Sequence, residues 1–241
     1  MVFQKEYLPQ FREADAGGRI GVRGYLNYFQ DAATHFMHNI DKGNDVIPEK
    51  YDVCWMFTKY HMQVLAEADF TSSIQMETWI EKIRASSIVQ QEIVISRDGV
   101  ALAKGSLESC LFDRKKNSLT RLEAVEFPMD AASPRGDGVG FTRMPRRIEG
   151  MEEAYSHTVR FTDLDKTRHM TNLRYINLML DAYGSAFYDR HGIKDFEIHY
   201  VSQCFEGEEI RICKKEEDGV AYLSVLHMDG TVAAQGRMIL L

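Results

Sequence analysis

A carboxylate and an imidazole lie close together in the second half of the chain. Asp165 and His169 belong to a short polar turn that also contains Thr167. A carboxylate can activate water or attack a carbonyl carbon, and an imidazole can move a proton near neutral pH. The turn therefore predicts an acid–base site.

A helix over residues 172–189 is predicted to position this turn. A helix N-terminus carries unpaired N–H groups and a partial positive charge. We expect the N–H groups of residues 170–172 to hold a developing oxyanion. The end of a preceding strand, over residues 155–163, is expected to carry Asp163 and Asp165. The predicted helix has apolar residues three or four positions apart, the spacing of one helix face: Leu173, Ile176, Leu180, Tyr183 and Phe187.

The same stretch occurs earlier in the chain, which indicates an internal repeat. At one constant spacing, Asp15, Tyr25, Asn27, Asp31 and Ala32 correspond to Asp165, Tyr175, Asn177, Asp181 and Ala182. At a second constant spacing, Asp98-Gly99, Ala103 and Gly105 correspond to Asp229-Gly230, Ala234 and Gly236. The chain is therefore predicted to be two copies of one unit.

Composition places the chain among ordinary globular proteins. It has 241 residues, of which 44% are hydrophobic and 27% charged. The net charge of −7 disfavours a nucleic-acid partner, and no apolar run is long enough to span a membrane. No secretion signal is evident at the start, so the four cysteines are expected to be reduced thiols. The expected location is cytoplasmic.

Each unit reads as one helix followed by antiparallel strands, an α+β pattern. Asp98-Gly99 is a favoured two-residue hairpin turn, and a second hairpin, of strands over residues 222–227 and 232–240, is predicted around Asp229-Gly230. A long helix wrapped by an antiparallel sheet is the hotdog arrangement, and two tandem copies can protect each other's sheet edges. We predict a tandem (double) hotdog, with a first hotdog over residues 1–125, a linker over 126–154 and a second hotdog over 155–241.

At these residues the sequence resembles the acyl-acyl-carrier-protein thioesterases, a plant and bacterial family with a tandem hotdog fold. The family pattern is approximately Asp-x-Asp-x-Asn-x-His-x-Asn-Asn-x-x-Tyr, and the resemblance runs along nearly the whole chain. The matching residues are Asp163, Asp165, His169, Asn172 and Tyr175. The departures are Thr167 and Thr171, where the family has Asn, and Gln203, where a later Glu-Cys pair on the predicted strand 196–205 has become Gln203-Cys204.

The resemblance implies a hydrolase that cleaves fatty acyl-acyl carrier protein, releases free fatty acid and so ends fatty acid synthesis. Asp165 would activate water or attack the thioester carbonyl, and His169 would orient the reacting groups and carry a proton. Cys204 is either an alternative nucleophile or a wall of the site. Thr167 and Gln203 are carried over as site positions rather than as roles. The implied partner is acyl carrier protein with a phosphopantetheine-linked acyl chain, and no cofactor or metal is expected.

The first unit is predicted not to catalyse, because Arg19 stands at the position of His169. The resemblance implies that this unit shapes the acyl pocket instead. Two basic groups could dock the acidic carrier protein, namely Arg114-Lys115-Lys116 and the set Arg143, Arg146 and Arg147. Candidate residues for a chain-length ruler are Phe29, Met37, Trp55, Met62 and Met76.

Two other functions stay open. The Asp15-Ala16-Gly17 turn suggests an acyl-CoA thioesterase of the 4-hydroxybenzoyl-CoA type, and Thr167 with Gln203 would suit a non-catalytic acyl-binding hotdog protein. A homodimer is also possible. Purely structural roles are the alternatives for two of these residues. Asp165 could serve simply as a turn-capping residue, and Cys204 simply as a small buried hydrophobic residue. The remaining histidines show no metal-ligand spacing: His35, His38, His61, His157, His191, His199 and His227.

Overall fold

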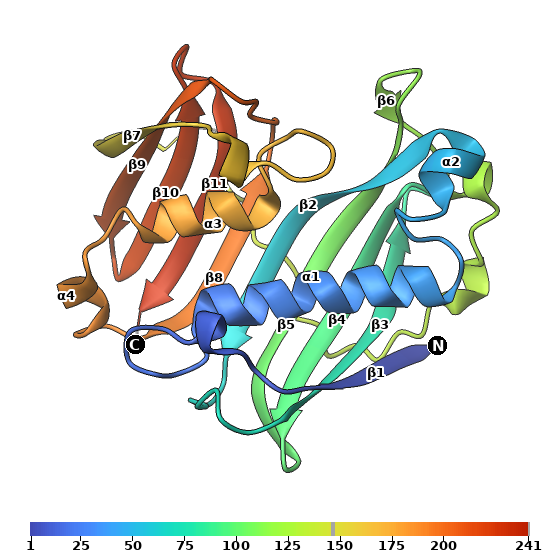
Figure 1. The fold of residues 1–241 in the computed structure, drawn as a ribbon, viewed down its shortest axis with the longest axis horizontal. Helices are drawn as coiled ribbons and strands as arrows, with labels where there is room; N and C mark the ends of the chain where they lie inside the picture. Colours follow the sequence, from blue (N-terminus) through green and yellow to red (C-terminus); the bar gives the residue numbers. More distant parts are fainter. Residues whose placement is uncertain (146–147, 241) are drawn as a thin grey trace. The chain divides into compact units, whose positions relative to one another are not determined.

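The computed structural model describes residues 1–145 and 148–240. The chain divides into two compact units, Met1–Gly140 and Phe141–Leu241. Each unit is a curved antiparallel sheet with one principal helix lying across it (Figure 1). In the described residues, no helix is both long and apolar enough to cross a membrane.

The first unit contains the longer helix. Its helices are α1 (Val22–Asn39) and α2 (Ile47–Tyr51), with 3-10 turns at Phe11–Glu13, Leu122–Val125 and Met129–Ala131. Its strands are β1 (Val2–Tyr7), β2 (Val53–Val64), β3 (Ile74–Arg84), β4 (Ile88–Arg97), β5 (Val100–Asp113) and the short β6 (Ser118–Leu119). The predicted apolar face of α1 is buried, as Leu26, Phe29, Ala33 and Phe36 show.

The second unit repeats this plan with shorter elements. Its helices are α3 (Asn172–Leu180) and α4 (Ser185–Tyr188), with a 3-10 turn at Phe161–Asp163. Its strands are β7 (Glu152–Thr158), β8 (Ile193–Tyr200), β9 (Glu209–Glu217), β10 (Val220–His227) and β11 (Val232–Leu240).

The two units have the same sheet topology. The strand order is β1-β3-β4-β5-β2 in the first unit and β7-β9-β10-β11-β8 in the second, and the paired strands run antiparallel. Each strand therefore has a counterpart at the same place in the other unit. Both predicted hairpins are present. Asp98-Gly99 forms the two-residue turn between β4 and β5, with positive φ at both residues, whereas a four-residue loop over residues 228–231 joins β10 to β11, with positive φ at Gly230.

A pair of equivalent glycines lets each helix approach its sheet. A Cβ atom on Gly105 would collide with the Phe29 ring and with the backbone of His61, and one on Gly236 would lie 2.9 Å from Met179 Sδ. Phe29 and Met179 occupy equivalent positions on α1 and α3. The repeated glycines found in the sequence thus mark a close helix–sheet contact in both units.

The second helix is shorter than predicted. α3 ends at Leu180 and a separate turn of helix begins after Gly184, so the single helix expected over residues 172–189 is wrong. Gly184 takes an extended conformation as the N-cap of α4, and glycine is a poor helix former. The first unit has Thr34 at the equivalent position, inside the uninterrupted α1.

Part of the predicted linker packs on the first unit. The N–H groups of Arg135 and Gly136 donate to Glu81, and the N–H of Val139 donates to Glu92 on β4. The Arg135 guanidinium lies 4.1 Å from the centre of the Trp79 ring. Residues 135–140 therefore cover the polar face of this sheet, because Glu92 alternates with the helix-facing residues of β4.

Candidate active site

The turn before α3 is closed by backbone hydrogen bonds. The Asp165 N–H donates to the His169 carbonyl over 3.0 Å, and the Arg168 N–H donates to the Asp165 carbonyl over 3.0 Å. Arg168 adopts a left-handed conformation with φ 63°. The 3-10 turn ends at Asp163, so Asp163 and Asp165 do not lie at a strand end as predicted. The tight loop turns the side chains of residues 165, 167 and 169 to one place.

Three of the predicted site residues form one hydrogen-bonded chain. The Thr167 hydroxyl lies 2.5 Å from Asp165 Oδ1 and 2.9 Å from His169 Nδ1. The Thr167 N–H also donates to Asp165 Oδ1, over 2.7 Å. Asp165 and Thr167 are exposed and His169 is half-buried, so solvent and a substrate can reach the carboxylate.

The hydroxyl of Thr167 fixes the tautomer that we assign to His169. A threonine hydroxyl has one proton, and a carboxylate can only accept. The hydroxyl therefore donates to Asp165 and accepts from the Nδ1–H of His169. The lone pair of His169 is then on Nε2, which can accept a proton.

The loop between β8 and β9 packs against the imidazole. His169 forms a β-bridge with Phe205, and their rings meet edge-to-face with centroids 4.9 Å apart. The Met170 N–H donates to the Cys204 carbonyl over 2.9 Å. Residues 204–205 thus align the backbone on which His169 stands.

Asp163 anchors the start of the turn. Its buried carboxylate lies 2.7 Å from His157 Nε2 and 2.7 Å from Arg174 Nε, and it accepts the Arg160 N–H over 2.8 Å. Burial alone would raise the pKa of Asp163, but the hydrogen bonds from Arg160 and His157 and the charge of Arg174 lower it. Asp163 is therefore an ionised structural group, and His157 is its partner.

Cys204 is a buried thiol in a loop, not on a strand. β8 ends at Tyr200, and the predicted strand over residues 196–205 is therefore too long. The thiol is fully buried, and burial raises the pKa of Cys204 to about 11, so it is protonated at neutral pH. Its N–H donates to the Tyr175 hydroxyl over 3.0 Å. The environment favours the wall role over the nucleophile role, while the neighbouring Gln203 is exposed.

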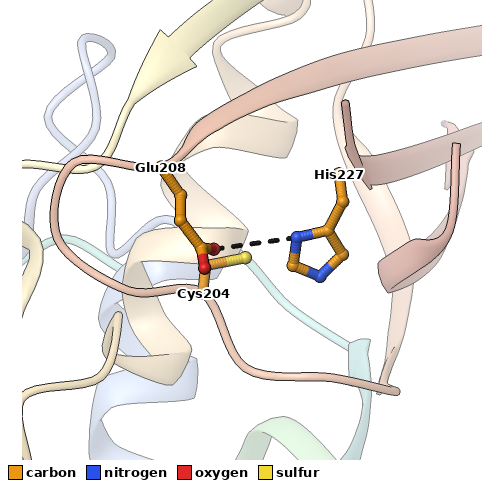
Figure 2. Close-up of side chains that lie close together, drawn as sticks. All are labelled: Cys204, Glu208 and His227. Carbon is orange, nitrogen blue, oxygen red and sulfur yellow. Dashed lines mark ion pairs between the residues drawn. The ribbon is translucent and has the colours of Figure 1, made fainter. Parts of the chain in front are cut away.

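Two residues that the sequence did not single out lie beside this thiol. Cys204 Sγ, a Glu208 carboxylate oxygen and a His227 ring nitrogen lie within 4.8 Å of one another (Figure 2). Figure 2 shows the Glu208 carboxylate facing the imidazole, with 3.7 Å between Glu208 Oε2 and His227 Nδ1. Groups of these types can bind a metal ion, but a contact between a carboxylate and an imidazole accounts for the same arrangement. Pairing of β9 with β10 brings His227 to the loop that carries Cys204 and Glu208, which local spacing does not reveal.

The predicted oxyanion donors are partly occupied. The Met170 N–H is bonded to Cys204, and the Thr171 N–H donates to the Asp163 carbonyl over 2.9 Å. These two groups hold the turn closed, so the prediction that they bind a substrate oxygen is wrong. The helix N-terminus still begins at Asn172.

The equivalent turn of the first unit lacks an acid–base pair. Arg19 lies 2.6 Å from Glu67 and 3.5 Å from Asp15. Asp15 Oδ1 accepts only backbone N–H groups in this turn, those of Gly17 and Arg19, each over 2.9 Å. A permanently charged guanidinium cannot accept a proton, so this turn is unsuited to general base catalysis.

The basic groups predicted for docking are largely neutralised or undescribed. Arg114 and Lys115 pair with Asp52 at 2.8 and 3.2 Å, and Lys116 pairs with Asp113 at 3.0 Å. In the second group Arg143 is exposed. Arg146 and Arg147 lie outside the described residues.

The fold is that of tandem hotdog proteins. An acyl-ACP thioesterase from Bacteroides thetaiotaomicron superposes with a TM-score of 0.89 at 14% identity, covering 100% of this chain and 98% of that one. The 12:0-ACP thioesterase from Umbellularia californica gives a TM-score of 0.81 at 16% identity, covering 100% and 97%. The predicted α+β tandem hotdog is confirmed.

Sequence comparison identifies the family. Residues 1–125 match the acyl-ACP thioesterase N-terminal domain, and residues 148–239 match the C-terminal domain. The chain belongs to the acyl-ACP thioesterase family.

The curated relatives are distant and longer. A dodecanoyl-acyl-carrier-protein hydrolase of Cinnamomum camphora is 18% identical over 221 residues, which are 85% of this chain and 56% of that protein. A palmitoyl-acyl carrier protein thioesterase of Arabidopsis thaliana is 20% identical over 218 residues, 85% of this chain and 52% of that protein. The chain spans about half the length of the curated relatives it matches.

Proposed function

We propose that this protein hydrolyses fatty acyl-acyl carrier protein and releases free fatty acid. Family membership and the names of the relatives support a thioester hydrolase. The observation that carries the proposal is the hydrogen-bonded chain from Asp165 through Thr167 to His169. It supplies a base at an exposed turn, which an acyl-binding protein without catalysis would not need.

His169 is the proposed general base, and Asp165 acts through Thr167. His169 Nε2 removes a proton from a water molecule whose oxygen forms a bond to the thioester carbonyl carbon. The carbon–sulfur bond then breaks, and the proton passes from His169 to the departing thiolate. The products are a fatty acid and the free phosphopantetheine thiol, so atoms and charges balance.

Asp165 steadies this base rather than attacking the substrate. Its Oδ1 accepts both the Thr167 N–H and the Thr167 hydroxyl, and such hydrogen bonds reduce the nucleophilicity of a carboxylate oxygen. Its charge favours the imidazolium that forms when His169 takes a proton. In this proposal Cys204 and Gln203 border the site and form no bond to the substrate.

The division of labour between the units is part of the proposal. Residues 155–241 carry catalysis, residues 1–125 hold the acyl chain, and residues 126–154 connect them. Two candidates for the chain-length ruler, Met37 and Trp55, line a cavity beside α1. The other three, Phe29, Met62 and Met76, are fully buried core residues.

Release of free thiol from a panel of thioesters tests the function. The panel pairs acyl carrier protein with coenzyme A at several chain lengths, and the enzymes are wild type, Asp165→Ala and the matched control Asp15→Ala. We expect release from carrier-protein thioesters that falls by a factor of about 10²–10⁴ in Asp165→Ala and is kept in Asp15→Ala.

The other outcomes separate the alternatives. Faster release from the coenzyme A panel would replace carrier protein by an acyl-CoA substrate. Tight binding of acyl thioesters without any release would show a binding protein. Equal losses in Asp165→Ala and Asp15→Ala would mean that both aspartates only support their turns.

A further inference from the structure

A cavity in the first unit lies between α1 and the helix-facing side of the sheet. Its apolar lining includes Met37 from α1 with Trp55 and Phe57 from β2. Its polar lining includes Asn44, Gln91 from β4 and Ser109 from β5. We name this space the α1 cavity.

The polar groups of the α1 cavity differ in their hydrogen bonding. The Asn44 amide is paired with the Trp55 backbone, accepting its N–H over 2.7 Å and donating to its carbonyl over 3.1 Å. The Gln91 amide oxygen and nitrogen and the Ser109 hydroxyl have no partner among the described residues, although Gln91 is 0% and Ser109 1% exposed. Buried amides and hydroxyls are normally bonded, because leaving them unpaired is costly.

The neighbouring residues on the same strands show what a satisfied arrangement looks like. Gln90 points to the opposite face of the sheet and donates to Glu92 over 2.7 Å. Ser106 donates to Glu92 over 2.5 Å and accepts the N–H of Gly140 over 3.0 Å. The unpaired atoms are therefore confined to the face that lines the α1 cavity.

Gln91 and Ser109 are close enough to bind one group. Ser109 is opposite Val89 and Gln91 is opposite Leu107 in the β4–β5 register, so the two are diagonal neighbours on one sheet face. Diagonal neighbours are about 7–8 Å apart, within reach of a long side chain. Together they offer one amide acceptor, an amide donor and a hydroxyl.

We propose that the α1 cavity selects acyl chains that carry a hydroxyl group, with Gln91 and Ser109 as the specificity-determining residues. This inference rests on the proposed function and names its substrate class. A ligand hydroxyl donates its proton to the Gln91 carbonyl oxygen and accepts from the Gln91 amide and from Ser109, so all three unpaired atoms gain a partner.

Other acyl chains satisfy fewer of these atoms. A keto oxygen only accepts, so it leaves the Gln91 carbonyl oxygen unpaired. A saturated chain offers no partner and would seal all three polar atoms in an apolar space. Sites that bind a ligand hydroxyl discriminate strongly against analogues without one, for this reason.

The test compares matched thioesters on the full chain. The substrates are acyl-acyl carrier proteins of one chain length that are saturated, keto-substituted or hydroxy-substituted, with the oxygen placed at successive carbons. The enzymes are wild type, Gln91→Met, Ser109→Ala and the control Gln90→Met. We expect wild type to favour one hydroxyacyl isomer over the saturated chain by about tenfold in kcat/KM. Gln91→Met should lose that preference and Gln90→Met should keep it.

A binding arm separates this inference from catalysis. Displacement of a fluorescent fatty acid by hydroxy and saturated acids of equal length needs no hydrolysis. If no thioester is hydrolysed but hydroxy acids still displace the probe better than saturated acids, the proposed function is wrong. The assignment of the α1 cavity to hydroxylated acyl chains would then stand. Equal affinity and equal kcat/KM for hydroxy and saturated chains overturns the inference, and means that Gln91 and Ser109 bind only water.

Discussion

The turn at residues 13–20 and the turn at residues 163–170 share their backbone hydrogen bonds. Asp15 N–H donates to the Arg19 carbonyl over 2.8 Å, as Asp165 N–H donates to His169 over 3.0 Å. In each turn the next residue donates to a distant loop, Ile20 to Ala68 and Met170 to Cys204. Both copies of the repeat therefore share this backbone conformation, so the conformation by itself does not make a catalytic site.

The chemistry of the two turns differs at three equivalent positions: Gly17 and Thr167, Arg19 and His169, and Glu67 and Gln203, the last pair preceding Ala68 and Cys204. In the first turn the Arg19 guanidinium pairs with the carboxylates of Asp15 and Glu67, so each of these charged groups has a partner of opposite charge. In the second turn the cation and one carboxylate are gone, and a hydroxyl links the remaining carboxylate to an imidazole. In the proposed mechanism, this loss of charge pairing is what allows proton transfer at the second turn.

The anchors of the two turns also differ, and this difference gives the largest expected effect. Asp163 faces the Arg174 guanidinium and the His157 imidazole, whereas its counterpart Glu13 accepts from neutral groups, including the Tyr28 hydroxyl and the Gln10 N–H. Removing one partner of a buried ion pair costs about 3–5 kcal/mol. We expect Asp163→Asn to speed amide hydrogen exchange over residues 163–180 of the second unit. Exchange over residues 13–30 of the first unit should stay unchanged and serves as the internal control.

The same residue gives a pH dependence whose sign follows from its lowered pKa. A carboxyl with a folded-state pKa below its unfolded value adds stability above the unfolded pKa, near 4, and loses it as the pH falls through the folded pKa. The protection of residues 163–180, measured relative to the intrinsic exchange rate at each pH, should therefore fall in acid in wild type and change less in Asp163→Asn. Identical acid responses in the two proteins would contradict the ion-pair account.

Thr167 offers a test of the hydroxyl link. Thr167→Val keeps the shape but removes the hydroxyl, so Asp165 no longer steadies His169. We expect kcat to fall by about tenfold to a hundredfold, with KM nearly unchanged, because the link matters only when the imidazole takes a proton. Thr167→Ser, which keeps the hydroxyl, should keep the rate. A Thr167→Val enzyme with normal kcat would leave Asp165 and His169 acting independently.

The sequence predicted those parts of the fold that recur in it. Matching residues at constant spacing revealed the two units, and the apolar face of α1 and the hairpins at Asp98-Gly99 and Asp229-Gly230 follow local rules. The predicted length of the second helix was wrong, because the apolar spacing continues across the break that Gly184 introduces. Helix periodicity describes which face is buried, but not whether the backbone stays helical between buried residues.

The candidate site was predicted only as far as contacts within the turn reach. Asp165, Thr167 and His169 are close in sequence, so the sequence brought them together and the structure added their hydrogen-bond order. His227 joins Cys204 and Glu208 through strand pairing, and Gln91 joins Ser109 through the β4–β5 register. Such groups meet because of the register between strands, which single-sequence spacing does not specify.

Transplanting the second turn's side chains into the first gives the smallest expected effect. A Cβ atom on Gly17 would lie 3.2 Å from the Arg19 side chain and from Asp15 Oδ1. Gly17→Thr combined with Arg19→His removes the first of these contacts, so the double variant should fold.

Glu67 would then lose its guanidinium partner and hold the introduced imidazole as a cation, which cannot act as a base. Added to His169→Ala, the pair should leave thiol release within about twofold of His169→Ala alone. A larger recovery would show that the turn suffices for catalysis, and that charge pairing by Arg19 is all that silences the first unit.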